Sequence, residues 1–197
     1  MRLNQLEEYT NQGNDEDKDE TARAVCQPQR GAYRSKMSAW RVLEHFGEQA
    51  NEDVLESIKN RLPVALKDFP TLTHETVNVG ILYEKRDANA KAFGYNRLIC
   101  LPPDEHTTNI TLWHELGHVA IRVRYENGED VAKTSEEFCS IYSVARMPPE
   151  AIDENRIPYL GEPGVPREEW PEICQRALEY RENNRNYIHQ CKEWLEI

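Results

Sequence analysis

Hydrophobic residues between positions 107 and 125 repeat at the spacing of an amphipathic helix. Those that share one face are Leu112, Leu116, Val119 and Val123. Spacings of four, three and four positions place side chains on a single face, which then packs on a core. Thr107 or Thr108 precedes the pattern and Asn127-Gly128 follows it, and such residues mark the start and the end of helices. We therefore predict a helix from Thr107 or Thr108 to about Tyr125.

Similar but shorter patterns predict helices on both sides of this one. They occupy 38–47, 52–62, 134–147 and 171–195, the last in one or two pieces. Between them, residues 76–83 alternate between apolar and small or polar positions, as half-buried strands do. A second strand is expected over 92–101, where Pro102-Pro103 ends it. We predict that the two strands form an antiparallel hairpin and that the fold class is α+β.

Composition and charge disfavour some classes of function for this chain, among them nucleic-acid binding and membrane insertion. The chain has 197 residues and a formal net charge of −11, and this excess of acid disfavours binding to nucleic acid, whose phosphates attract clustered Lys and Arg. It contains no apolar run of membrane-spanning length, and residues 1–20 lack the apolar segment of a signal peptide. Its five cysteines form no C-x-x-C pair, which favours reduced thiols in a cytoplasm. We expect a cytoplasmic protein that does not contact membranes.

The central helix carries the sequence His114-Glu115-Leu116-Gly117-His118, an H-E-x-x-H motif. Residues four apart lie on one helix face, so both imidazoles can bind one Zn²⁺ ion. Glu115 points elsewhere and can take a proton from a water molecule bound to that metal, the arrangement found in metalloproteases. Gly117 weakens the helix by about 1 kcal/mol relative to Ala, which indicates a close approach of another backbone or room for a ligand.

A catalytic zinc site usually has a third protein ligand. The extended H-E-x-x-H-x-x-G-x-x-H motif is excluded, because Ile121 and Arg124 occupy its Gly and last His positions. The remaining candidates are Glu136 and Glu137 on the following helix. Glu137 shares its helix face with Ile141 and Val144, and a metal would compensate a carboxylate on such an inward face. We therefore predict Glu137 as the ligand, with Glu136 as the fallback.

Glu137 also has a purely structural interpretation. Thr134-x-x-Glu137 matches a capping box, in which the glutamate would only stabilise the start of the helix.

Taken together, the motifs resemble the ImmA/IrrE-like family of zinc metallopeptidases, which are minimal gluzincins. The family has a HELGH helix, here His114 to His118, and a second helix with an E-A-x-x-F-A-x-x-L-L-M-P run. In this chain that run reads Glu137-Phe-Cys-Ser-Ile-Tyr-Ser-Val-Ala-Arg-Met147-Pro148. The glutamate and the terminal Met-Pro match in register, whereas the alanine, the F-A pair and the L-L pair do not. The resemblance covers about residues 76–150.

The resemblance implies an α+β fold in which a small curled sheet lies against the HELGH helix and the next helix bears the last ligand. It also implies that an extended protein or peptide substrate binds along an edge strand, and that a repressor or regulator protein is cleaved. We accordingly divide the chain into an acidic, flexible segment 1–35, a zincin-like domain 36–150, and a proline-rich loop and helical extension 151–197 packed on that domain.

Two functions of different classes remain. The first is a zinc-dependent endopeptidase that acts on an intracellular protein, with Glu115 as the general base. The second is a zinc-containing protein-binding or regulatory module with little or no peptidase activity, a role that gives no reason for Glu115. A peptidase also needs a group that stabilises the oxyanion. Sequence spacing does not choose among Tyr125, Tyr142, His106 and His189.

Overall fold

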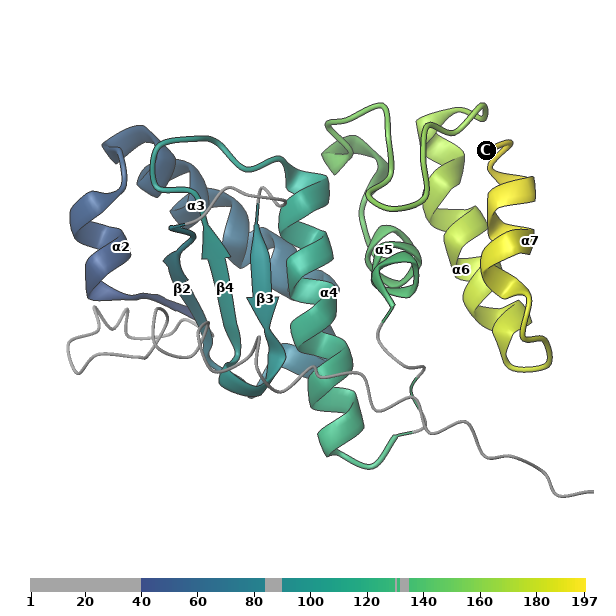
Figure 1. Cartoon of the computed structure of the whole chain (residues 1–197), viewed down its shortest axis with the longest axis horizontal. Coiled ribbons are helices and arrows are strands. Elements are labelled where there is room, and N and C mark those ends of the chain that lie inside the picture. The colour runs from purple at the N-terminus through teal and green to yellow at the C-terminus, as the bar shows by residue number, and fades with distance from the viewer. Residues whose placement is uncertain (1–39, 84–89, 130, 132–134) are drawn as a thin grey trace, which may run out of the picture.

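The computed structural model describes residues 40–83, 90–129, 131 and 135–197 (Figure 1). The predicted flexible segment 1–35 lies outside the described residues. The described part combines helices with one small sheet, which confirms the α+β class.

The sheet contains four strands in the order β1-β2-β4-β3. Their bounds are β1 Trp40–Val42, β2 Val77–Ile81, β3 Lys91–Phe93 and β4 Leu98–Leu101. β2 lies between β1 and β4 and is parallel to both, while β3 is antiparallel to β4. Every residue of β2 is buried, as is usual for a strand inside a parallel region. β3 is therefore one edge of the sheet, and its pairing with β4 places Ala92 opposite Ile99.

The predicted hairpin of 76–83 with 92–101 is wrong in its pairing. The second predicted strand is divided by a 3₁₀ turn over Gly94–Asn96 and by Arg97, whose φ of 49° is left-handed. The two halves, β3 and β4, form the antiparallel pair, and β2 aligns parallel to the second half. Hydrophobic alternation gives no information about strand direction, and the turn residues Gly94 and Asn96 were the signal that could have divided the run.

The helices are α2 Glu44–Gln49, α3 Glu52–Ala65, α4 Asn109–Glu126, α5 Glu136–Val144, α6 Trp170–Arg181 and α7 Tyr187–Trp194. The prediction of the central helix is confirmed, with Thr108 as its N-cap and Asn127 as its C-cap. The predicted helix 38–47 is wrong in its first half, because Trp40–Val42 pairs with β2 and the helix begins only at Glu44. α3 continues past Pro63, and the final helix is formed in two pieces.

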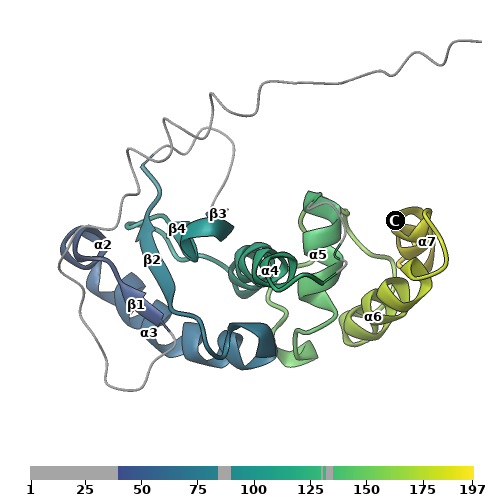
Figure 2. The ribbon, with the colours of Figure 1, turned by 90° about the horizontal axis from the view of Figure 1, so that it is seen from below.

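The elements form successive layers around α4. Figure 2 shows α4 end-on between the sheet and α5, with α6 and α7 beyond α5 and with α2 and α3 beside the sheet. One hydrophobic cluster extends through these layers, from Phe46 and Ile58 through Leu116 to Ile141 and Cys191. α4 is consequently buried on most of its circumference, and its two histidines lie at the junction with α5.

Candidate metal centre

α4 presents His114 and His118 on its α5 side. The Thr108 hydroxyl accepts a hydrogen bond from the backbone N–H of Thr111 and fixes the start of the helix. His114 and His118 follow one turn apart, so their rings come together, with centroids 4.8 Å apart. The His114 residue is only 3% exposed. The helix therefore holds the pair in a sheltered position, as the sequence predicts.

A carboxylate from α5 completes a group of three donor atoms. Glu136 is the first residue of α5, directly after its N-cap Ser135. Its Oε2 atom lies 3.0 Å from His114 Nε2 and 3.0 Å from His118 Nε2, and the two Nε2 atoms are 3.2 Å apart. The Glu136 side chain is 48% exposed, so the group is open to solvent on this side.

The predicted ligand Glu137 is wrong in this structure, because the fallback Glu136 occupies that position. Glu137, the next residue, is turned by about 100° around the helix axis. There its charge acts on Tyr187 of α7. The capping-box alternative depends on Thr134, which lies outside the described residues. The N-cap of α5 is Ser135, whose hydroxyl accepts a hydrogen bond from Phe138 N–H. Glu137 is the glutamate that matches the first position of the E-A-x-x-F-A run. Because Glu136 lies at the histidines instead, the ligand position of that run is not matched in register.

The wrong prediction has a clear physical cause. The α5 face that packs on α4 is made of small polar residues, and Ser140 and Ser143 on it are each only 1% exposed. A Cβ atom at Gly117 of α4 would lie 2.1 Å from Ser143 Oγ, so the helices approach closely at this point. The face of α5 that packs on α4 is therefore the one with the smallest side chains, not the most hydrophobic one. Ile141 and Val144 pack into the core on another side of α5.

Both histidines are oriented by hydrogen bonds on their second ring nitrogen. Ser140 Oγ lies 3.1 Å from His114 Nδ1 and donates to the Pro158 carbonyl oxygen at 2.5 Å. Because a carbonyl only accepts, the serine uses its proton there and accepts from His114 Nδ1–H. Cys139 Sγ lies 3.1 Å from His118 Nδ1, within the range of a hydrogen bond to sulfur. A neutral imidazole that carries its proton on Nδ1 has its Nε2 lone pair free to bind a metal.

The three donors fit a zinc ion. Tetrahedral bonds of about 2.0–2.1 Å require donor atoms roughly 3.3 Å apart. The observed separations of 3.0, 3.0 and 3.2 Å are close to this value. Two imidazole nitrogens and one carboxylate oxygen are also a donor set that zinc uses at catalytic sites, where a fourth position stays open. The group can thus hold a metal ion.

The electrostatics of the group favour a positive charge between its members. Burial lowers the pKa of His114, whereas the pKa of His118 is raised to about 10, since hydrogen bonds to Cys139 and Glu136 outweigh burial. The contacts of its carboxylate with the imidazoles of His114 and His118 hold the pKa of Glu136 well below its usual range. A divalent cation supplies the positive charge that a proton on His118 otherwise provides.

Glu115 lies apart from the donor atoms, on the side of α4 that faces the sheet. It is 6% exposed, and burial raises its pKa to about 7, although the charge of His118 and the backbone N–H of Ala92 in β3 act against this rise. A carboxyl group with a pKa near neutrality can both accept and release a proton. Glu115 meets the backbone of the edge strand β3, and the charges of His118 and Glu136 act on it.

None of the four residues considered for oxyanion stabilisation makes a described contact with the donor group. Tyr142 is buried against Phe69 and Phe138, and Tyr125 lies at the end of α4 under Arg122. The remaining two are surface histidines that pair with acidic residues, His106 with Asp53 and His189 with Glu193.

The aromatic residue that does reach the donor group is Tyr159. Its ring stacks on that of His114, with centroids 5.3 Å apart and an interplanar angle of 26°. Tyr159 is not among the candidates from the sequence, because it lies in the loop 150–168, where no helical or strand periodicity indicates the direction of a side chain.

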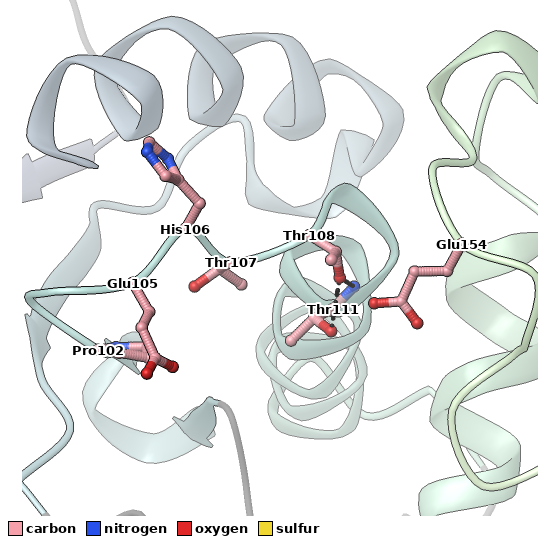
Figure 3. Close-up of a pocket in the computed structure, with 7 residues that line it drawn as sticks. All are labelled: Pro102, Glu105, His106, Thr107, Thr108, Thr111 and Glu154. Carbon is pink, nitrogen blue, oxygen red and sulfur yellow. Dashed lines mark hydrogen bonds between the residues drawn. The ribbon is translucent and has the colours of Figure 1, made fainter. Parts of the chain in front are cut away.

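A polar cavity of about 60 Å³ lies at the N-terminal end of α4 (Figure 3). It is lined by Pro102, Glu105, His106, Thr107, Thr108, Thr111 and Glu154. The lining includes Thr111, one turn before His114, but none of the three donor residues. The cavity is therefore a neighbour of the centre rather than part of it.

Comparisons with protein-family models, with curated proteins and with solved structures found no match to this chain. Within the described residues, no helix combines the length and the apolar character needed to cross a membrane.

Proposed function

We propose that the chain is a zinc-dependent endopeptidase of the H-E-x-x-H type. His114, His118 and Glu136 hold the metal, and Glu115 is the general base. The observation that carries the proposal is the convergence of the three donor atoms within hydrogen-bond distance of one another. The same helix carries a buried carboxylate, Glu115, that is not one of the three. A structural zinc site usually has four protein ligands, whereas this group has three and is open to solvent on the Glu136 side.

When bound, Zn²⁺ supplies Lewis acidity toward water and toward the carbonyl of the scissile peptide bond. Side chains of the protein orient the metal-binding histidines and transfer the proton. Ser140 and Cys139 fix the orientation of the two imidazoles through their Nδ1 atoms. Glu115 accepts a proton from the attacking water and returns it to the leaving amine, and its pKa of about 7 suits both steps. General-base catalysis of this kind contributes about 10²–10⁴-fold to the rate.

The edge strand β3 supports a protein or peptide substrate. Among the described strands, β3 pairs on one side only, with β4, and it lies next to Glu115 through Ala92. An extended peptide can add to such an edge by backbone hydrogen bonds, which would bring its carbonyls past the metal-binding face of α4. The resemblance to the ImmA/IrrE-like family favours a repressor or regulator protein in the cytoplasm as the substrate. That part of the proposal rests on analogy alone.

The test compares wild type with Glu115→Gln in a host lysate, with new protein N-termini labelled and identified. The substitution keeps the shape of the side chain and removes the base, so zinc content and thermal stability should match those of wild type. Cleavage sites produced by wild type should disappear, or fall by about 10²–10⁴-fold in rate on the purified substrate. Glu172→Gln, an exposed position in the first turn of α6, is the matched control and should cleave as wild type does.

Two results would contradict this mechanism. A zinc-loaded Glu115→Gln protein that cleaves as fast as wild type would exclude Glu115 as the base. If wild type produced no cleavage but still bound a protein partner through the same face, the chain would be a zinc-containing binding module instead.

A further inference from the structure

We propose that Tyr159 is a further catalytic residue, whose hydroxyl donates a hydrogen bond to the scissile carbonyl oxygen as negative charge develops on it. The inference rests on the proposed peptidase function and adds to it the oxyanion-stabilising group that sequence spacing did not identify. Its basis is the placement of the phenol over one metal-binding histidine, on a loop that is fixed from both ends.

The phenol ring lies against the imidazole of His114, whose Nε2 faces the other two donors. Tyr159 is nevertheless 56% exposed. One face of the ring is thus engaged with the metal-binding histidine, while the rest of the side chain is open to a molecule that enters from solvent. A residue in this position can meet a substrate carbonyl at the metal without rearrangement of the core.

The loop that carries Tyr159 is anchored on both sides. Ile157 and Gly161 form a bridge with hydrogen bonds of 2.8 and 3.1 Å in opposite directions, and Ile157 and Leu160 are buried in the core. The Ser140 hydroxyl bonds the carbonyl oxygen of Pro158, directly before the tyrosine. One serine therefore orients His114 and also fixes the loop beside it.

The backbone of Tyr159 is left-handed, with φ of 60°. A bulky residue pays a conformational cost in this region, and such residues concentrate where the surrounding structure needs them for binding or catalysis. Packing alone gives no reason for this cost, because the side chain it presents is more than half exposed. The strained conformation directs the ring toward His114 instead of toward the core.

The phenol can serve as a hydrogen-bond donor to an oxyanion. A tyrosine hydroxyl is protonated at neutral pH, since the ordinary pKa of the group is about 10. The ring of Tyr159 is held against the imidazole of His114, one of the three donor residues. A protonated hydroxyl at this point matches the requirement of an oxyanion, which accepts hydrogen bonds and is weakened by nearby anions.

The test uses two dipeptide inhibitors on zinc-loaded protein and measures their affinities by calorimetry. A peptidyl phosphonamidate carries anionic oxygens on a tetrahedral centre and so imitates the oxyanion. A mercaptoacyl dipeptide binds zinc through sulfur and presents no such oxygen. Tyr159→Phe keeps the ring and its stacking on His114 but removes the hydroxyl. It should weaken the phosphonamidate by about 10- to 100-fold, which is the range of a hydrogen bond to a charged group, and leave the thiol unchanged.

Tyr125→Phe is the matched control, since this tyrosine is exposed near the C-terminal end of α4. It should bind both inhibitors as wild type does, and zinc content should be equal in all three proteins. Equal binding of the phosphonamidate by Tyr159→Phe and wild type would overturn the role of Tyr159 alone. Loss of zinc from Tyr159→Phe would overturn it too, because the hydroxyl would then support the metal site. If wild-type protein bound neither inhibitor, the proposed peptidase function would fail, and the role of Tyr159 with it.

Discussion

Ser143 of α5 occupies the space that a side chain at residue 117 of α4 would need. A Cβ atom at Gly117 would lie 2.1 Å from Ser143 Oγ, but 3.5 Å from Ser143 Cβ and 3.4 Å from the Cys139 carbonyl oxygen. Only the hydroxyl creates the conflict, and that hydroxyl is buried without a hydrogen-bond partner among the described residues. The close approach of these helices is what brings Glu136, at the start of α5, to the histidines of α4.

We expect Gly117→Ala to destabilise the fold by up to about 2 kcal/mol, because overpacking costs about 1–3 kcal/mol and the gain in helix propensity offsets about 1 kcal/mol of it. Ser143→Ala removes an unpaired buried hydroxyl and should be neutral or slightly stabilising. In the double variant the new methyl groups stand at ordinary contact distance, so stability should return to at least that of wild type. Denaturant unfolding of the four metal-free proteins measures the coupling between the two positions.

Gly47→Ala in α2 is the control for propensity alone, because its Cβ atom would meet only a Val42 methyl group at 3.7 Å. It should not destabilise the protein. A Gly117→Ala penalty that persists unchanged in the Ser143→Ala background would show that the two helices are not in contact at this point.

The two adjacent glutamates should differ sharply in their effect on the metal. Glu136→Gln removes the carboxylate that lies 3.0 Å from both Nε2 atoms. Its zinc affinity should fall by more than the ~10–100-fold that is typical of a lost supporting hydrogen bond. Glu137→Gln should leave the affinity nearly unchanged. Competition with a chromogenic chelator ranks the two variants, and the opposite order would mean that α5 is rotated in solution relative to this structure.

The central helix and the pairing of its two histidines were predictable because several local signals agree. The apolar spacing, the Thr108 cap and the Asn127-Gly128 end all specify one helix, and the positions of His114 and His118 on it follow from its geometry. Gly117 was interpreted as a sign of a close backbone approach or of room for a ligand, and the structure shows α5 close to this position. These features depend on residues that are near one another in sequence.

The features that sequence analysis missed depend on contacts between distant segments. Glu136 rather than Glu137 lies at the histidines because Ser140 and Ser143 are small enough for their face of α5 to pack closely on α4. A pattern of polar and apolar positions contains no information about side-chain size. Strand direction in the sheet depends on where the chain returns after β2. Tyr159 reaches His114 through a loop whose course is set by the Ile157–Gly161 bridge and by Ser140.

Ser140 should support the metal without binding it. Ser140→Ala removes the acceptor of His114 Nδ1–H and frees the Pro158 carbonyl, so zinc affinity should fall by about 10–100-fold. Ser143→Ala, one turn further along the same face, contacts neither histidine in the described structure and is the matched control. The chelator competition should show wild-type affinity for Ser143→Ala. Equal zinc affinities of the two variants would show that Ser140 does not support the metal-binding histidine.

The measurement that tests the central claim most directly is the zinc content of the purified protein, together with X-ray absorption at the zinc edge. We expect about one zinc ion per chain, bound by nitrogen and oxygen donors at roughly 2.0–2.1 Å. His114→Ala and His118→Ala proteins should remain folded and lose the zinc. Stoichiometric zinc in the double His→Ala protein would contradict the assignment of the site. So would a sulfur ligand at about 2.3 Å, which would indicate that Cys139 binds the metal instead of orienting His118.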